Sequence, residues 1–146
     1  VVPLLVFKNQ DQQQYARNVI AYVQGLYNVS IEPTLLKSKE IKLAVAEAAM
    51  IHGFEYIYVG ITKELDAFLV NWNPNNFKSS KWVIGPFENL DKSEVVKLAI
   101  EHKMEELFLI THSCAEQAVG RCNQCNRCRE RAWAFSQLGL TDLGNI

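Results

Sequence analysis

Hydrophobic positions along the first third of the chain follow the patterns of strands and helices that succeed one another. Val2–Phe7 is an unbroken apolar run, typical of a strand that is buried on both faces of a parallel sheet. Apolar residues then recur at helical spacing to about Leu26, which predicts an amphipathic helix. Val29–Ile31, which ends before Pro33, predicts a short second strand.

The same pattern repeats once more before residue 60. A helix is predicted to begin after Ser38, to bury a broad apolar face, and to end at Gly53. Phe54–Val59, which ends at Gly60, predicts a third strand. The order strand, helix, strand, helix, strand with short loops is typical of an α/β domain. We therefore expect a parallel sheet with helices on both faces.

The second half of the chain is less regular. Residues 60–81 break the periodic pattern, and turn-forming residues dominate 71–76. Beyond them the sequence predicts four segments: a strand at 82–84, a helix at 92–101 capped by Asp91, a short apolar stretch at 107–110, and a helix at 129–138 that stops at Gly139. Because no repeat or low-complexity tract divides these elements, we expect a single α/β domain over residues 1–146.

The loops at one edge of the predicted sheet are where a site is expected. In open parallel sheets, ligands bind beyond the carboxyl ends of the strands. In this sequence those loops are Lys8–Asp11, Gly60–Asp66 and the approach to Cys114. A site is therefore expected in these three loops, and capping a helix is one role open to Asp66, which ends the second loop.

All four cysteines fall within fifteen consecutive residues: Cys114, Cys122, Cys125 and Cys128. The two-residue gaps let a tight turn aim successive thiolates at one point, which suits tetrahedral Zn²⁺. Two disulfides are the alternative, but disulfide scaffolds are usually smaller and richer in cysteine. A redox pair would leave two thiols unexplained. The spacing therefore predicts a four-cysteine zinc knot within residues 111–131, followed by a C-terminal helix.

Composition and charge exclude several classes of protein. The chain has 146 residues, a formal net charge of −1 and 21% charged residues, so its overall charge indicates no general affinity for nucleic acid. No apolar run approaches the roughly 20 residues that span a bilayer. The apolar start lacks the basic leader and cleavage site of a signal peptide. With its cysteines predicted to be reduced, we expect a cytoplasmic protein without a membrane partner.

Basic residues and one histidine surround the predicted zinc knot. Arg121, Arg127, Arg129 and Arg131 could contact nucleic acid or a phosphate-bearing ligand. The alternative is a solvated helix start whose arginines pair locally or hydrogen-bond backbone carbonyls. His112 precedes Cys114 by two residues, and with four cysteines present we expect it to lie beside the ligand set or to face the cleft rather than to bind the metal.

The region from residue 111 onward resembles the C-terminal signature of the 7-cyano-7-deazaguanine synthase family. The matching residues are Thr111–Cys114, Gly120–Arg131, Ala134–Phe135, Gly139 and Asp142. Shorter similarities lie upstream, at Leu4–Phe7, at Val59–Gly60 with Asp66, and at Pro86 with Lys92. The resemblance therefore covers nearly the whole chain, although only the cysteine-rich segment is specific.

This resemblance implies an enzyme that uses ATP to adenylate 7-carboxy-7-deazaguanine. Ammonia then gives an amide, and a second activation gives the nitrile, an intermediate for queuosine. The fold implied is the adenine nucleotide alpha hydrolase-like sheet. By position, the four cysteines carry over as zinc ligands. Lys92 carries over as a candidate contact to phosphate or adenylate, and Asp66 as a candidate site residue.

The sequence also departs from the family pattern. The S-G-G-x-D-S loop that follows the family's first strand is absent, as is any Gly-Gly pair, so no backbone cradle for the phosphates of ATP is seen. The alignment implies a fold truncated before its second strand. We therefore expect a fragment or partner of such an enzyme, either a homo-oligomer or a chain whose companion supplies the loop. The alternatives are an inactive binding or assembly module and a zinc-knuckle nucleic-acid binder.

Overall fold

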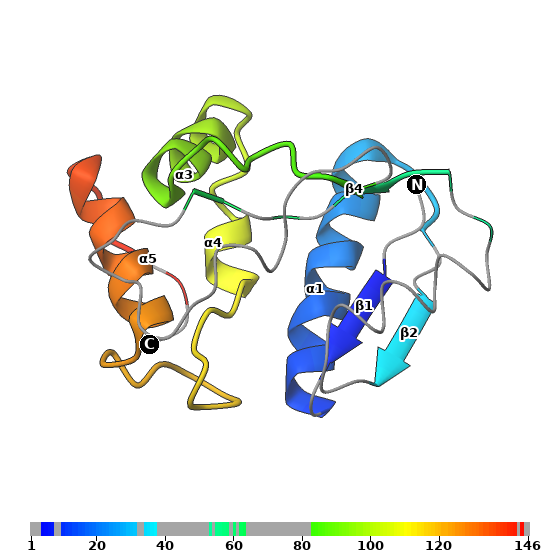
Figure 1. Cartoon of the computed structure of the whole chain (residues 1–146), viewed down its shortest axis with the longest axis horizontal. Coiled ribbons are helices and arrows are strands. Elements are labelled where there is room, and N and C mark those ends of the chain that lie inside the picture. Colours follow the sequence, from blue (N-terminus) through cyan, green and yellow to red (C-terminus); the bar gives the residue numbers. More distant parts are fainter. Residues whose placement is uncertain are drawn as a thin grey trace.

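The computed structural model describes residues 4–7, 10–31, 34–37, 53, 55–58, 60, 62–63, 83–142 and 144. Within these ranges the elements follow in the order β1 (Leu4–Phe7), α1 (Gln10–Tyr27), β2 (Thr34–Lys37), β3 (Ile57–Tyr58), β4 (Val83–Ile84), α3 (Lys92–Glu101), α4 (Leu107–Ile110) and α5 (Asn126–Gln137). Figure 1 shows α1 beside β1 and β2 at one end of the molecule, and α3, α4 and α5 gathered at the other.

The described strands form two parallel pairs. β1 pairs with β2 so that Leu4 lies opposite Thr34 and Phe7 opposite Lys37. β3 pairs with β4 in the same sense, with Ile57 opposite Val83. Parallel pairing is therefore confirmed, as are the strand at Leu4–Phe7 and the helix α1 that lies between it and β2. A single wider sheet covered on both faces remains a prediction, because the strands within the described ranges belong to two separate pairs.

The predicted strand at Val29–Ile31 is wrong. Asn28 adopts a positive φ of 51° at the end of α1, and the Val29 N–H donates to the Gln24 carbonyl oxygen at 3.2 Å. The Gln24 side-chain amide donates to the Ile31 carbonyl oxygen at 3.2 Å. These main-chain groups bond to the helix end and not to a neighbouring strand. The strand forms after Pro33, in Thr34–Lys37.

The predicted strand at Phe54–Val59 is shorter in the structure. Of the described residues within this segment, only Ile57–Tyr58 form a strand. The Tyr58 side chain is 63% exposed, so the strand is not fully buried. The backbone at Gly53 has a φ of +62°, as expected of a residue that ends a helix. The predicted helix before Gly53 and the turn-rich segment at 71–76 lie outside the described residues.

Helix α3 begins and ends as its sequence predicts. The Asp91 carboxylate accepts hydrogen bonds from the N–H groups of Ser93 at 2.8 Å and Glu94 at 3.0 Å. The Glu94 carboxylate accepts in turn from the Asp91 N–H at 2.8 Å, which completes a capping box. This reciprocal pair satisfies amides that the first turn of a helix cannot satisfy internally.

The two helices around the cysteines differ slightly from expectation. The apolar stretch Leu107–Ile110 is a single helical turn, α4. Helix α5 begins at Asn126, three residues before the predicted start, because Cys125 already has the extended backbone of an N-cap. Gly139 follows the helix with a φ of +66°, which confirms it as the stop residue.

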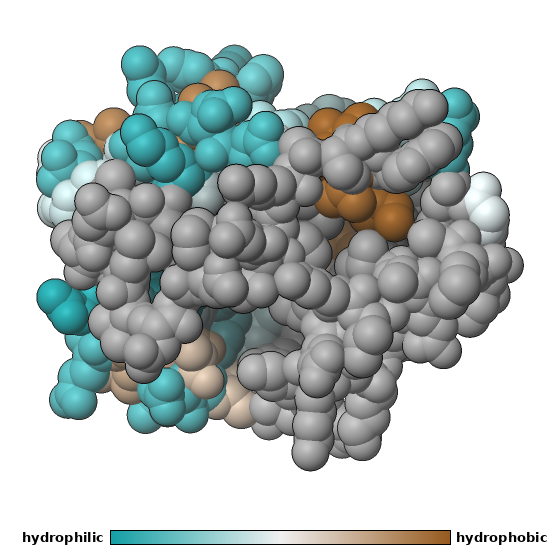
Figure 2. Space-filling view, viewed as in Figure 1, coloured by the Kyte–Doolittle hydropathy of each residue, from teal (hydrophilic) through white to brown (hydrophobic). Residues whose placement is uncertain are grey.

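The buried core lies where α3 packs against α5. Val96, Ala134 and Phe135 are buried there, and Ile100, Phe108, Trp133 and Leu138 pack around them. The rings of Phe108 and Phe135 meet edge to face with centroids 4.9 Å apart, which joins α4 to this core. Figure 2 shows hydrophilic residues over the outer surface of this end of the molecule. Among the described helices, none combines the length and hydropathy needed to cross a membrane.

Candidate metal centre

The four cysteine sulfurs meet at one point. Their Sγ atoms all lie within 4.8 Å of one another, and Cys122 Sγ is 4.0 Å from Cys128 Sγ. Zn–S bonds of about 2.3 Å in a tetrahedron place sulfurs roughly 3.8 Å apart, so the cluster has the dimensions of a four-thiolate zinc site. A disulfide needs a bond of about 2.05 Å. The donor set therefore fits one metal ion better than two disulfides.

Different elements supply the four ligands. Cys114 lies in the segment after α4, Cys122 and Cys125 flank a tight turn, and Cys128 lies in the first turn of α5. Asn123 takes a positive φ of 56° within that turn, a conformation that Asn tolerates better than most residues. This turn aims both flanking thiols at the same point. The two-residue spacing seen in the sequence therefore has the expected structural effect.

Main-chain amides point at the sulfurs. Cys122 Sγ accepts from the N–H of Cys125 at 3.2 Å and of Gln124 at 3.5 Å. Cys114 Sγ accepts from the N–H of Gln117 at 3.3 Å. Hydrogen bonds to a thiolate favour the charged form, which is the form that binds a metal.

These contacts shift the pKa values of the thiols in opposite directions. Burial works to raise the pKa of Cys114, but the N–H groups of Cys122, Gln117 and Glu116 outweigh it and lower the pKa to about 6. Burial, followed by the neighbouring Cys125 thiol, raises the pKa of Cys128 to about 12. Four thiolates so close together repel one another, and a dication removes that repulsion. Metal binding here would therefore release protons.

His112 lies beside the knot and outside the cysteine cluster. Its Nε2 lies 3.0 Å from the Gly120 carbonyl oxygen, so Nε2 carries the proton and donates. Its ring stacks on Tyr15 of α1, with centroids 4.6 Å apart and planes inclined by 18°. The histidine thus joins the loop before Cys122 to the N-terminal helix. Nothing in the sequence pattern indicated Tyr15 as its partner.

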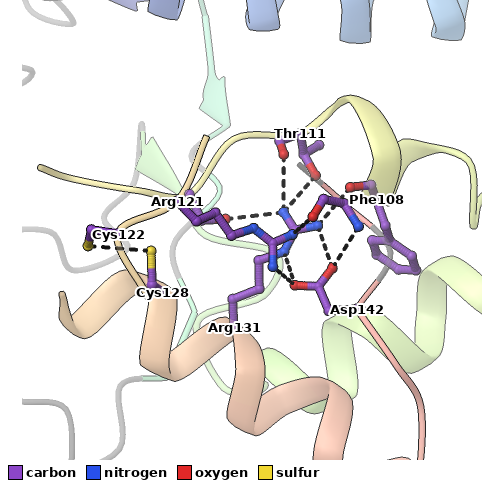
Figure 3. Close-up of polar contacts among 9 residues, drawn as sticks. Phe108, Thr111, Arg121, Cys122, Cys128, Arg131 and Asp142 are labelled. Carbon is purple, nitrogen blue, oxygen red and sulfur yellow. Dashed lines mark hydrogen bonds and ion pairs between the residues drawn. The ribbon is translucent and has the colours of Figure 1, made fainter. Parts of the chain in front are cut away.

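A buried ion cluster adjoins the cysteines, and we call Arg121, Arg131 and Asp142 the Asp142 clasp. The Asp142 carboxylate accepts from Arg131 Nε at 2.7 Å and Nη2 at 3.0 Å, and from Arg121 Nη1. The three side chains are 11% exposed or less. Burial works to raise the pKa of Asp142, but the bonds from the two arginines hold it below its ordinary value. Figure 3 shows both guanidinium groups directed at this carboxylate, next to Cys122 and Cys128.

The guanidinium of Arg131 also binds the backbone that leads into the knot. It donates to the carbonyl oxygens of Phe108 at 2.7 Å and Thr111 at 3.2 Å, and to the hydroxyls of Thr111 at 3.0 Å and Ser113 at 3.3 Å. All three nitrogens of this guanidinium group therefore donate hydrogen bonds. Arg121 and Arg131 thus pair with a carboxylate and bond to backbone carbonyls, as the alternative to a nucleic-acid contact predicted, but they are buried and do not form a solvated helix start.

The remaining two arginines of the basic group differ from these. Arg127 lies 3.5 Å from the buried carboxylate of Glu130 and is about half exposed. Arg129 is exposed on α5. Only part of the group is therefore presented to solvent.

The other candidate site residues are less well defined. Asp66 lies outside the described residues. Lys92 is the first residue of α3, and the amides of Ser93 and Glu94 that follow it already bond to Asp91, so these two amides are not available to a phosphate. The Lys63 N–H donates to the Leu90 carbonyl oxygen at 2.8 Å. The structure thus brings together the segments that follow β3 and β4, as parallel strands require.

A comparison with protein families identifies the chain. The model of the family described as queuosine biosynthesis protein QueC matches residues 67–139, which is half of the chain and holds all four cysteines. The chain belongs to the QueC family. This confirms the resemblance for residues 67–139, and the shorter similarities upstream of them stay predictions. Lys92 lies inside the matched stretch, and Asp66 lies immediately before it.

Two curated relatives support the QueC assignment. The 7-cyano-7-deazaguanine synthase of Azotobacter vinelandii is 34% identical over 59 residues, which are 39% of this chain and 25% of the relative. The 7-cyano-7-deazaguanine synthase of Gloeobacter violaceus is 33% identical over 60 residues, or 39% and 26% of the two chains. The matched part of the chain thus spans about a quarter of the length of these relatives. No solved structure matches.

Proposed function

We propose that this chain is the zinc-holding part of an ATP-dependent 7-cyano-7-deazaguanine synthase. The reaction converts 7-carboxy-7-deazaguanine and ammonia to the nitrile by way of an adenylate and an amide. One observation carries the proposal: four sulfurs within 4.8 Å of one another lie inside the stretch that the QueC family model matches. Two relatives, each similar to 39% of this chain, are named for that synthase.

The metal has a structural role in this proposal. Cys114, Cys122, Cys125 and Cys128 would fill all four positions of a tetrahedral Zn²⁺, leaving none for a substrate or water. When bound, the ion supplies folding energy and no redox chemistry. It holds the segment before Cys114, the turn at Cys122–Cys125 and the start of α5 together. The parallel strand pairs would then belong to a wider adenine nucleotide alpha hydrolase-like sheet.

The nucleotide would be held largely by residues other than those of the knot. The sequence has no S-G-G-x-D-S loop, and a second copy of the chain would lack it as well, so the phosphate cradle would come from another segment or from a different companion chain. Lys92 would add a cationic side chain where the segments after β3 and β4 meet, because the Lys63 N–H bonds to Leu90 there. Asp66 would lie on the same predicted loop. The cytoplasm, where ATP is abundant, is the expected location.

A two-part assay tests this function. The purified protein is analysed for zinc by mass spectrometry, with one ion per chain expected, and Cys125→Ser should lose it. The same preparation is then given ATP, ammonium and 7-carboxy-7-deazaguanine, and we expect pyrophosphate release that depends on the carboxylate. If the chain alone releases no pyrophosphate, release should appear when a co-purified chain that bears the S-G-G-x-D-S loop is added.

The outcomes separate the alternatives. A zinc-loaded, folded chain that gives no product in either arrangement contradicts the synthase role and favours a binding or assembly module. A zinc-knuckle nucleic-acid binder is less well supported, because Arg121 and Arg131 are buried against Asp142 and unavailable to phosphates. Such a binder would show an affinity that falls steeply with salt.

A further inference from the structure

The Asp142 clasp touches every segment that carries a metal ligand. Arg121 directly precedes Cys122, and Arg131 follows Cys128 by three residues on α5. Thr111 and Ser113, which accept bonds from Arg131, lie just before Cys114. The same few side chains therefore fix the backbone on both sides of the cluster, although none of them is a ligand.

Asp142 is the residue on which the clasp depends. It is the ionic partner of both buried guanidinium groups, through the same Oδ2 atom. Without its negative charge, two buried cations would repel each other and lose their compensation, which is costly in a poorly hydrated environment. The segments attached to Arg121 and Arg131 would then separate. The distance between the sulfurs of Cys122 and Cys128, which these segments carry, would then no longer be fixed.

The backbone of Gly144 lies against the same cluster of side chains. The Gly144 N–H donates to Asp142 Oδ1 at 3.1 Å, and the Gly144 carbonyl oxygen accepts from Arg121 Nη2. A Cβ at Gly144 would collide with the Phe108 carbonyl oxygen and with the Arg131 guanidinium. The backbone at Gly144 is therefore inserted between the two arginines and α4, where only a glycine fits.

We propose that the Asp142 clasp positions the metal ligands, so that docking of Asp142 and Gly144 and retention of the metal stabilise each other. This inference rests on metal binding by the four cysteines, as proposed above. Ordering the three ligand segments costs conformational entropy. The clasp orders these segments before the ion binds, so the free energy of metal binding is not reduced by that cost. Coupling between two binding events is reciprocal. Loss of the clasp therefore speeds metal release, and loss of the metal loosens the contacts of Asp142 and Gly144.

The release of Zn²⁺ to an excess of chromogenic chelator measures the first half of this coupling. Asp142→Asn should release zinc about tenfold faster than the wild type, at the lower end of the effect of residues that orient metal ligands. Arg129→Gln, a change at an exposed arginine of the same helix, is the matched control and should leave the rate nearly unchanged. Arg131→Lys should release zinc faster than the wild type and more slowly than Arg131→Gln, because Lys keeps the charge and loses the bidentate bond.

Hydrogen exchange of the peptide that contains residues 138–144 measures the second half. We expect strong protection in the zinc-loaded wild type, and loss of this protection both in the zinc-free protein and in zinc-loaded Asp142→Asn. Substitution of Co²⁺ should give the same tetrahedral thiolate spectrum in the wild type and in Asp142→Asn. That result would show that the ligand set is unchanged while its retention is weaker.

Each outcome bears on one of the two proposals. A wild type that binds neither Zn²⁺ nor Co²⁺ overturns the metal part of the proposed function. A wild type that binds zinc, with Asp142→Asn releasing it at the same rate, overturns only the positioning role. If circular dichroism shows that Asp142→Asn does not fold, Arg121→Gln replaces it, since it leaves the Arg131–Asp142 pair intact. Release from Arg121→Gln at the wild-type rate would then contradict the inference.

Discussion

The two ends of the molecule are stabilised in different ways. Between β4 and Gly144, directional contacts at fixed positions dominate: a capping box, a buried ion cluster and four converging sulfurs. Among the side chains whose burial the structure describes, all the buried hydrophobic ones belong to this region. In α1, by contrast, the described side chains are half-buried or exposed, and Leu26 and Tyr27 at its end are 46% and 58% exposed.

This difference concerns how much each region depends on individual residues. A helix held by an apolar face tolerates many substitutions of similar size, because burial is non-directional. A cluster of ligands and ion pairs depends on each partner, because removing one leaves another uncompensated. Substitutions should therefore have large effects near the cysteines and small effects on α1. The predictions below test this contrast, starting with the largest expected effect.

Loss of one metal ligand should have the greatest effect. Cys114→Ser should abolish zinc binding and lower the free energy of unfolding by about 5 kcal/mol or more, because structural zinc contributes folding energy directly. Thermal unfolding with and without a chelator measures this effect. The matched control is Ala115→Ser, which places the same hydroxyl on the next, exposed residue. Equal melting curves for the two variants would contradict a structural metal.

Adding one methyl group should distinguish the two regions directly. Gly144→Ala should destabilise the protein by about 2 kcal/mol, because its Cβ has no room beside the Phe108 carbonyl oxygen and the Arg131 guanidinium. Gly25→Ala in α1 meets nothing within 4 Å and should stabilise the protein by about 0.5 kcal/mol, since Ala favours a helix. Urea denaturation measures both changes. If Gly144→Ala and Gly25→Ala changed the free energy of unfolding in the same direction, the proposed difference between the two regions would be contradicted.

Removal of the α3 cap should have an intermediate effect. Asp91→Ala leaves the amides of Ser93 and Glu94 without their acceptor and should cost about 1 kcal/mol. The control is Glu101→Ala at the exposed last residue of the same helix, with an expected change of only about 0.3 kcal/mol. Chemical denaturation at neutral pH compares the two. A larger loss for Glu101→Ala would show that the cap is not a major stabilising contact.

The smallest effect expected is a dependence on pH at the same cap. Burial works to raise the pKa of Asp91, but the bonds from Ser93 and Glu94 outweigh it and hold the pKa below its ordinary value. A lowered folded-state pKa gives stability that is present above the unfolded value and is lost as pH falls through the folded value. Asp91→Asn keeps a capping oxygen and does not titrate. The stability difference between wild type and Asp91→Asn should therefore be constant from about pH 7 to 5 and shift against the wild type below about pH 4.

Local features of this protein were predictable because their signals lie within a few residues. The two-residue spacing of Cys122, Cys125 and Cys128 favours a tight turn, and the structure confirms that their sulfurs converge with that of Cys114. Asp91 followed by Glu94 completes a capping box within one turn. Gly139 stops α5 because it adopts a positive φ. Each of these depends on the geometry of a short segment of backbone.

The contacts between distant segments were decided only in three dimensions. Arg131 bonds to Asp142, to Thr111 and to the Phe108 carbonyl among many possible partners, and no pattern in the sequence ranks them. The stacking of His112 on Tyr15 joins residues that are far apart in the chain. The segment 29–31 has the composition of a strand, yet its backbone bonds to the end of α1.

By itself the sequence determined the cysteine cluster and the family, because both depend on residue type and spacing. The tertiary structure decided how that cluster is held. The partners of a buried arginine or carboxylate depend on which segments the fold brings together, and spacing along the chain does not encode that choice.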